Sequence, residues 1–120
     1  MDLIALAKTG EIADGAAKEF SLTQYHPPLE LIVIRKNQRY FAYLNRCPHT
    51  GISLNWLPDQ FFDIDHEYIQ CATHGALFTV DNGYCVRGPC AGASLRAVSI
   101  VIEDAMIYFK PTHEIIAPRN

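Results

Sequence analysis

Short runs of β-branched and aromatic residues alternate with polar turn residues along most of this chain. The runs return at intervals of roughly ten residues, a rhythm typical of an all-β fold. Segments 29–35 and 39–44 flank the polar residues 36–38 and predict a β-hairpin. Further strands are predicted over 76–80, 84–87, 97–102 and 106–110, with turns at 81–83 and 103–105.

A second hairpin is predicted in the middle of the chain, where residues 61–64 can pair with residues 67–70 across a turn at 65–66. The acidic side chains of this region alternate with apolar ones, as on the exposed face of a strand. They are Asp63, Asp65 and Glu67. This pattern argues against a pair of catalytic carboxylates.

The opening of the chain is predicted to form a strand, a loop and a second strand. Residues 3–20 resemble an amphipathic helix, but Gly10 and Gly15 interrupt the pattern. The apolar stretch at residues 1–7 is short and lacks a basic leader. It therefore predicts neither a signal peptide nor a membrane span.

Composition narrows the possible functions. A chain of 120 residues with 49% hydrophobic content fits one compact domain, predicted to span residues 1–120. The net charge of −3 and the scattered Lys and Arg residues argue against nucleic-acid binding. We expect a cytoplasmic protein without a membrane anchor, and in that compartment four cysteines favour metal binding or redox chemistry over disulfides.

Two short motifs each bring a cysteine close to a histidine. The first, CPHTG, contains Cys47 and His49, and the second, CATHGA, contains Cys71 and His74, with 21 residues between the two sets. Two Cys and two His can form a tetrahedral zinc site, but such sites usually separate the Cys pair from the His pair. A mixed pair in each loop suits a two-iron cluster with cysteines on one iron and histidines on the other.

Glycines follow the ligand positions in both motifs. Gly51 and Gly75 come directly after these positions, where a tight turn without a Cβ would let backbone amides approach bridging sulfides.

At these motifs the chain resembles the Rieske family, whose signature is C-x-H followed by C-x-x-H on an all-β scaffold. The similarity covers about residues 3–110 and continues through the sequence DNGYCVRGP. It implies small antiparallel sheets or a partly open barrel, with a cluster-binding part at about residues 45–92. It also implies that Cys47, His49, Cys71 and His74 bind one [2Fe–2S] cluster. The spacer is longer than in compact family members, so we expect an enlarged excursion there.

The resemblance also separates two types of Rieske centre. High-potential, membrane-anchored members carry a disulfide between the cluster loops, at positions that are Ile52 and Thr73 here. They also place hydroxyl donors near the cluster sulfurs, where this chain has Ala76 and Phe78. Because hydrogen-bond donors to sulfur stabilise the reduced state, their absence predicts a low reduction potential.

The function implied is that of a one-electron carrier, a Rieske-type ferredoxin that passes electrons between a reductase and an oxygenase or another redox enzyme. No nucleophile with its base and no phosphate-binding loop was found in the sequence, so we expect no catalytic activity of its own. Two alternatives stay open. One is a small redox subunit similar to that of nitrite reductases, and the other is a cluster-based redox sensor.

The remaining cysteines and histidines are predicted to lie outside the metal site. Free buried thiols are favoured for Cys85 and Cys90, with a disulfide between them as the alternative. Three histidines are predicted to be solvated surface residues, and three other residues could form an apolar docking rim. The histidines are His26, His66 and His113, and the rim residues are Ile52, Pro89 and Trp56.

Overall fold

The computed structural model describes residues 2–48, 53–55, 57, 59–73, 75–112 and 115. Within these residues the fold is all-β, as predicted, with three antiparallel sheets of three strands each. The strands are β1 (Ile4–Lys8), β2 (Ala17–Leu22), β3 (Leu29–Lys36), β4 (Arg39–Leu44), β5 (Tyr68–Gln70), β6 (Leu77–Thr79), β7 (Cys85–Arg87), β8 (Ile100–Glu103) and β9 (Met106–Phe109). In these same residues, no helix has the length and apolar character needed to cross a bilayer.

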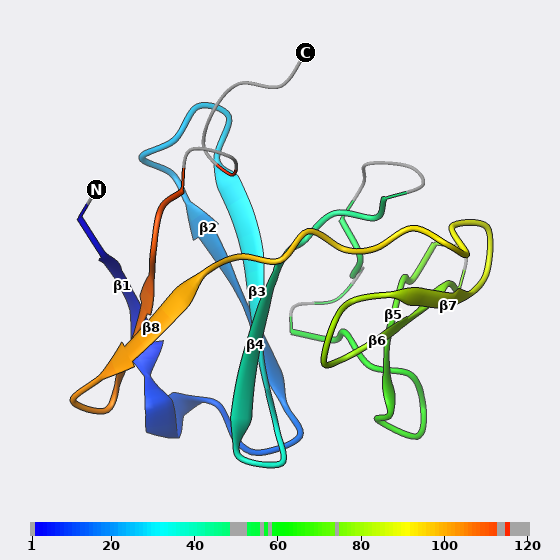
Figure 1. Ribbon diagram of the computed structural model, residues 1–120, viewed down its shortest axis with the longest axis horizontal. Coiled ribbons are helices and arrows are strands. Elements are labelled where there is room, and N and C mark those ends of the chain that lie inside the picture. Colours follow the sequence, from blue (N-terminus) through cyan, green and yellow to red (C-terminus); the bar gives the residue numbers. More distant parts are fainter. Residues whose placement is uncertain are drawn as a thin grey trace.

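Two of the sheets combine into a base, on the left in Figure 1. One has the order β1-β9-β8 and the other β2-β3-β4. The segment that leads into β8 joins them, because the Leu44 amide donates to the Arg96 carbonyl and the Val98 amide donates to the Ala42 carbonyl, both at 2.9 Å. This edge-to-edge pairing gives the partly open barrel expected from the sequence. Its core is apolar and includes Leu31, Val33, Ile107 and Phe109.

The predicted turns of the base are confirmed. The β3–β4 hairpin turns at Asn37 and Gln38, and the β8–β9 hairpin turns at Asp104 and Ala105, all four with positive φ. Two consecutive residues with positive φ give a turn whose twist matches that of paired strands. The opening also follows the prediction, with a short 3-10 turn, Thr9–Glu11, in the loop between β1 and β2.

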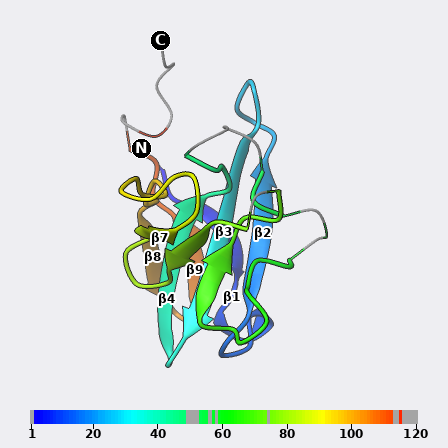
Figure 2. The ribbon, with the colours of Figure 1, turned by 90° about the vertical axis from the view of Figure 1, so that its right-hand side faces the viewer.

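The third sheet, in the order β5-β6-β7, forms a separate unit beside the base. Figure 2 shows it in front of β3 and β4. Side chains from both units share one buried core, in which Ile32 and Ile34 of β3 pack with Ile69 of β5 and Phe78 of β6. The second unit therefore packs against the base through this shared core.

The predicted hairpin at 61–70 is only partly right. Phe62 pairs with Ile69 through a single bridge, and β5 makes its ladder with β6 instead. The Asp63 carboxylate accepts hydrogen bonds from the Glu67 and Tyr68 amides, at 2.9 and 3.0 Å. These bonds close residues 63–67 into a turn, so the prediction that the acidic residues line a strand face is wrong.

Tyr43 of β4 ties the base to the second unit. Its hydroxyl donates to the Val80 carbonyl at 2.7 Å, and its ring lies against Gly83. A Cβ at Gly83, which has φ +68°, would come within 2.8 Å of this ring. Burial, with the charge of Asp81 as a smaller cause, raises the pKa of Tyr43 to about 12.

We predict that Tyr43→Phe lowers the free energy of unfolding by about 1 to 3 kcal/mol, because the buried Val80 carbonyl loses its partner. Wild-type stability should also fall with alkaline pH in a way that the variant does not share. The unfolded chain ionises this phenol near pH 10 and the folded protein only near 12, so its contribution is complete below pH 10 and is lost as the pH rises through 12.

Denaturant titrations between neutral pH and pH 12 measure this difference. Tyr84→Phe is the matched control, because Tyr84 is 46% exposed. Equal effects of the two substitutions at every pH would contradict the role given to Tyr43.

Candidate metal centre

The first Cys/His loop leaves the end of β4 and is held by Asn45. This asparagine is buried, and its amide donates to the Glu30 carbonyl on β3 at 3.0 Å. Its side-chain oxygen accepts from the Leu54 amide at 2.9 Å, and its side-chain nitrogen donates to Asn55 Oδ1 at 3.0 Å. One side chain therefore ties together the two ends of the loop that carries Cys47.

The segment that follows is anchored to the base. Asn55 Nδ2 donates to Glu19 Oε2 at 2.6 Å, and the Glu19 amide donates to Asp59 Oδ1 at 2.8 Å. These contacts attach the long spacer to β2. Sequence reasoning missed both Asn45 and Asn55, because an asparagine after a strand has no spacing that distinguishes a loop clamp from an ordinary turn residue.

The second Cys/His loop is a tight turn between β5 and β6. The Cys71 amide donates to the Ala76 carbonyl at 2.9 Å, and the Gly75 amide donates to the Cys71 carbonyl at 2.8 Å. Gly75 has φ +70°, a conformation that favours glycine. The predicted turn is thus present. In this structure the Gly75 amide donates its hydrogen bond to the Cys71 carbonyl within the turn.

The two loops contact each other directly. The Ala72 amide donates to the Leu54 carbonyl at 2.7 Å, which links the end of the first loop to the start of the second. Cys47 and Cys71 are 2% and 0% exposed and belong to the same buried core. The structure therefore brings both predicted cysteine ligands into one apolar interior.

A third segment, after β7, closes over the second loop. Gly88 has φ +105°, and a Cβ there would lie 2.8 Å from the Ala76 Cα. Only a glycine allows the backbone to approach Ala76 so closely. The same segment carries Pro89, which is exposed, and Cys90, which is buried.

None of the four cysteines forms a disulfide, in agreement with the prediction of buried thiols at Cys85 and Cys90. The Sγ atoms of these two residues lie 2.9 Å apart. Burial, followed by the hydrogen bond to Cys85 and by the nearby sulfurs of Cys85 and Cys47, raises the pKa of Cys90 to about 12.

The predicted histidine ligands, His49 and His74, lie outside the described residues, as do Ile52, Trp56 and His113. Of the other predicted surface residues, His26, His66 and Pro89 are exposed as expected. Among the residues that the structure describes, His, Cys, Asp and Glu side chains do not gather in groups of three or more that could hold a metal ion. Both predicted cysteine ligands are thus buried in one core, and the assignment of all four residues as iron ligands remains a prediction.

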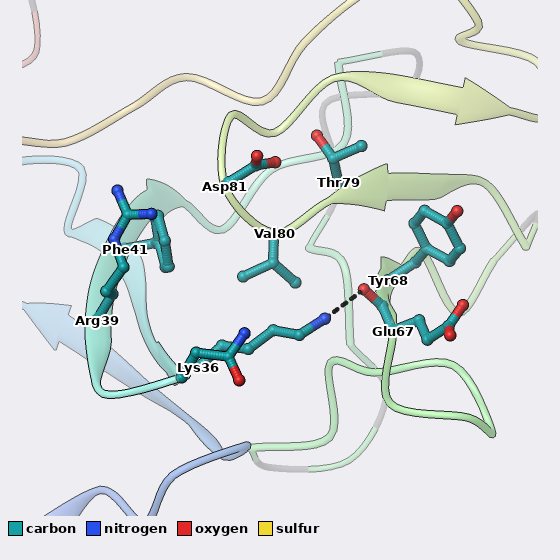
Figure 3. A pocket seen from close by; sticks show the side chains of 9 residues that line it. Lys36, Arg39, Phe41, Glu67, Tyr68, Thr79, Val80 and Asp81 are labelled. Atoms are coloured by element: carbon teal, nitrogen blue, oxygen red, sulfur yellow. Dashed lines mark hydrogen bonds between the residues drawn. The ribbon is translucent and has the colours of Figure 1, made fainter.

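A pocket of about 440 Å³ lies between the tip of the β3–β4 hairpin and the β5–β6 sheet (Figure 3). The Lys36 side chain spans the pocket, and its Nζ donates to the Glu67 carbonyl at 3.1 Å. Charged residues of both signs line it, including Arg39 and Asp81, and none of the cysteines does. The pocket is therefore a junction between the two units and lies apart from the metal centre.

The pattern of two Cys/His loops on this fold matches a known family. A model of the Rieske [2Fe-2S] domain matches residues 2–109. The chain belongs to the Rieske family. Its cofactor is therefore a [2Fe–2S] cluster. A search of curated protein sequences found no match.

Solved Rieske structures share the fold at low sequence identity. The ferredoxin of carbazole 1,9a-dioxygenase from Nocardioides aromaticivorans IC177 is 22% identical, with a TM-score of 0.72 over 93% of this chain and 100% of that chain. A chain in a complex of reduced oxygenase and oxidised ferredoxin of carbazole 1,9a-dioxygenase is 20% identical, with a TM-score of 0.71 over 89% of this chain and 91% of that chain.

A larger relative contains the same fold as one part. The terminal oxygenase of carbazole 1,9a-dioxygenase from Novosphingobium sp. KA1 is 19% identical, with a TM-score of 0.73 over 89% of this chain. This chain spans only 29% of that oxygenase chain. At these identities the similarity shows a shared fold.

The described residues of this Rieske domain fit its cofactor. Thiolates are the protein ligands of iron in such clusters, and a thiolate buried in apolar surroundings is costly unless a cation compensates it. Cys47 and Cys71 are buried in an apolar core, and each comes from a loop whose backbone is fixed by hydrogen bonds. The donor chemistry and the rigid supports are those that sulfur ligation of iron requires.

We predict that Gly88→Ala destabilises the protein more than Gly92→Ala does. Both glycines have positive φ, so both substitutions carry a backbone cost of about 1 to 2 kcal/mol. A Cβ at Gly88 also overlaps Ala76, whereas one at Gly92 meets nothing within 4 Å. The overlap should add about 1 to 3 kcal/mol.

Denaturant unfolding of the two holoprotein variants under anaerobic conditions measures the difference. Gly88→Ala should also lose visible absorbance sooner during storage, because the segment over the second loop is displaced. Equal losses of unfolding free energy in the two variants would show that the close approach of Gly88 to Ala76 does not contribute to stability.

Proposed function

We propose that this protein is a one-electron carrier whose cluster is held by Cys47, His49, Cys71 and His74. The observation that supports the proposal best is the burial of both cysteines in one core by two mutually bonded loops. When bound, a [2Fe–2S] cluster supplies reversible one-electron transfer. The histidines are assigned from the spacing of the two motifs in the sequence.

The two residue types would have different roles. Cys47 and Cys71 would bind the inner iron as thiolates, since both sulfurs lie in the apolar interior. His49 and His74 would bind the outer iron as neutral imidazoles. Replacing two thiolates by neutral ligands makes the site less negative, which keeps its potential above that of an all-cysteine ferredoxin.

The surroundings of the cysteines support a low potential within the Rieske range. Ala76 and Phe78 are buried in the same core as Cys47 and Cys71, and neither side chain can donate a hydrogen bond to sulfur. Thr73 carries no thiol that could form an inter-loop disulfide. Fewer donors to sulfur leave the reduced state less stabilised.

The proposed partners are other redox proteins, with a reductase as electron donor and an oxygenase or another redox enzyme as acceptor. Similar folds occur in a ferredoxin and in a ferredoxin–oxygenase complex of carbazole dioxygenase systems, which supports this class of partner. Exposed Pro89, beside buried Cys90, could contribute to a small transient docking surface. We further propose that residues 1–120 form a single domain, with the cluster-binding part at about 45–92, in a cytoplasmic protein.

Substitution of His49 or His74 by alanine should abolish or change the EPR signal of the dithionite-reduced protein. In the wild type, mixed thiolate and imidazole ligation should give an average g value clearly below that of an all-thiolate cluster. His66→Ala is the matched control, because His66 is exposed and is not in the proposed ligand set. A wild-type signal in both ligand variants would overturn the assignment.

The midpoint potential of the holoprotein should lie toward the lower end of the range of about −150 to +300 mV known for such centres. Potentiometric titration followed by visible absorbance measures it. A midpoint above about +100 mV would contradict the argument from the missing sulfur donors.

A further inference from the structure

Cys85 and Cys90 form a sulfur pair that the proposed ligand set does not use. Their Sγ atoms lie 2.9 Å apart in the buried core. The Cys85 S–H donates to the Arg87 carbonyl at 3.3 Å, which leaves its sulfur to accept from the Cys90 S–H. The two thiols therefore face each other and are not separated by other side chains.

The backbone holds the pair in this position. The Cys85 amide donates to the Ala93 carbonyl at 2.9 Å, and the Cys85 carbonyl accepts from the Gly92 amide at 3.4 Å. The Ala93 amide also donates to the Cys90 carbonyl at 2.9 Å. These bonds close the segment from 85 to 93 and hold the backbones of Cys85 and Cys90 close to each other.

The environments of the two sulfurs differ. Cys90 is 6% exposed and lies between two exposed residues, Pro89 and Ala91, whereas Cys85 is 1% exposed and lies at the start of β7. A small reagent from solvent would reach Cys90 first. Cys85 Sγ then lies 2.9 Å from Cys90 Sγ, in position to react with it.

We propose that Cys85 and Cys90 are a redox modification site, which a low-molecular-weight disulfide such as oxidised glutathione converts from a dithiol into an intramolecular disulfide. The Cys90 thiol loses its proton, attacks the external disulfide, forms a mixed disulfide and releases one small thiol. Because the pKa of Cys90 is raised to about 12, this step is slow at neutral pH, and the reaction is therefore followed to equilibrium. The Cys85 thiolate then attacks Cys90 Sγ and releases the second. Two electrons and two protons pass from the pair to the external disulfide.

The geometry favours the second step. A disulfide bond is about 2.05 Å long, so the sulfurs need to approach by less than about 1 Å from their present separation. Closure would fix the segment that packs against Ala76 of the second Cys/His loop, because Gly88 lies between the two cysteines. The site would thus couple the thiol redox state to the surroundings of the metal centre.

The inference rests on the proposed function only in that Cys47 and Cys71 are taken to be committed to iron. The experiment uses the anaerobic holoprotein, equilibrated with oxidised and reduced glutathione in a series of ratios. After acid quenching and alkylation, trypsin and a protease that cleaves before aspartate place Cys85 on peptide 81–87 and Cys90 on peptide 88–96. Cys47 and Cys71 fall on peptides 47–58 and 65–80.

A linked species of peptides 81–87 and 88–96 should rise from near zero to near completion as the ratio becomes more oxidising, and dithiothreitol should reverse it. Cys85→Ser and Cys90→Ser should each lose this species, and Cys85→Ser should stop at a mixed disulfide on Cys90. Both should keep the visible spectrum of the wild type. Mapping of the wild type alone also decides the question if either variant folds poorly.

Persistent alkylation of Cys90 across the whole series, a mixed disulfide without closure, or a link from Cys90 to Cys47 or Cys71 would each overturn the proposal. Visible absorbance of the same samples reports the cluster independently. Loss of the linked species with an intact spectrum refutes only the thiol site, whereas a linked species in protein without a cluster spectrum refutes only the ligand assignment.

Discussion

The proposed metal centre depends on the burial of two cysteine sulfurs in one apolar core. Cys47 and Cys71 come from separate loops that the Ala72–Leu54 hydrogen bond holds together. Two buried thiolates without a compensating cation would be costly, and iron bound by both, as proposed, would remove that cost. Asn45 and Gly88 support this arrangement. Asn45 closes the loop that carries Cys47, and Gly88 lets the segment after β7 approach Ala76 in the loop that carries Cys71.

The rest of the fold supplies a rigid support for these loops. The joined sheets of the base keep β3 and β4 fixed, and the first loop leaves β4 directly. Tyr43 connects β4 to the turn after β6. Both Cys/His loops are therefore held in position by the same pair of sheets. Electron carriers benefit from such rigidity, since ligand positions that do not change between redox states keep the reorganisation during transfer small.

Features with a local cause could be predicted from the sequence. The turns at 36–38 and 103–105 and the paired motifs at 47–49 and 71–74 depend on residues close together in the chain. The hairpin predicted at 61–70 is only partly formed, because pairing is limited to residues around the Phe62–Ile69 bridge. The Asp63 carboxylate binds two amides and closes residues 63–67 into a turn, a contact that hydrophobic alternation does not encode. The clamp at Asn45 and the Cys85–Cys90 contact depend on tertiary packing, and no spacing rule signals them.

The metal content of anaerobically purified protein tests the central claim most directly. Iron, acid-labile sulfide and zinc should be measured on the same sample and related to protein concentration. A [2Fe–2S] centre predicts about two iron atoms and two sulfides per chain, without stoichiometric zinc. About one zinc per chain, without iron or sulfide, would contradict the account and favour a tetrahedral zinc site.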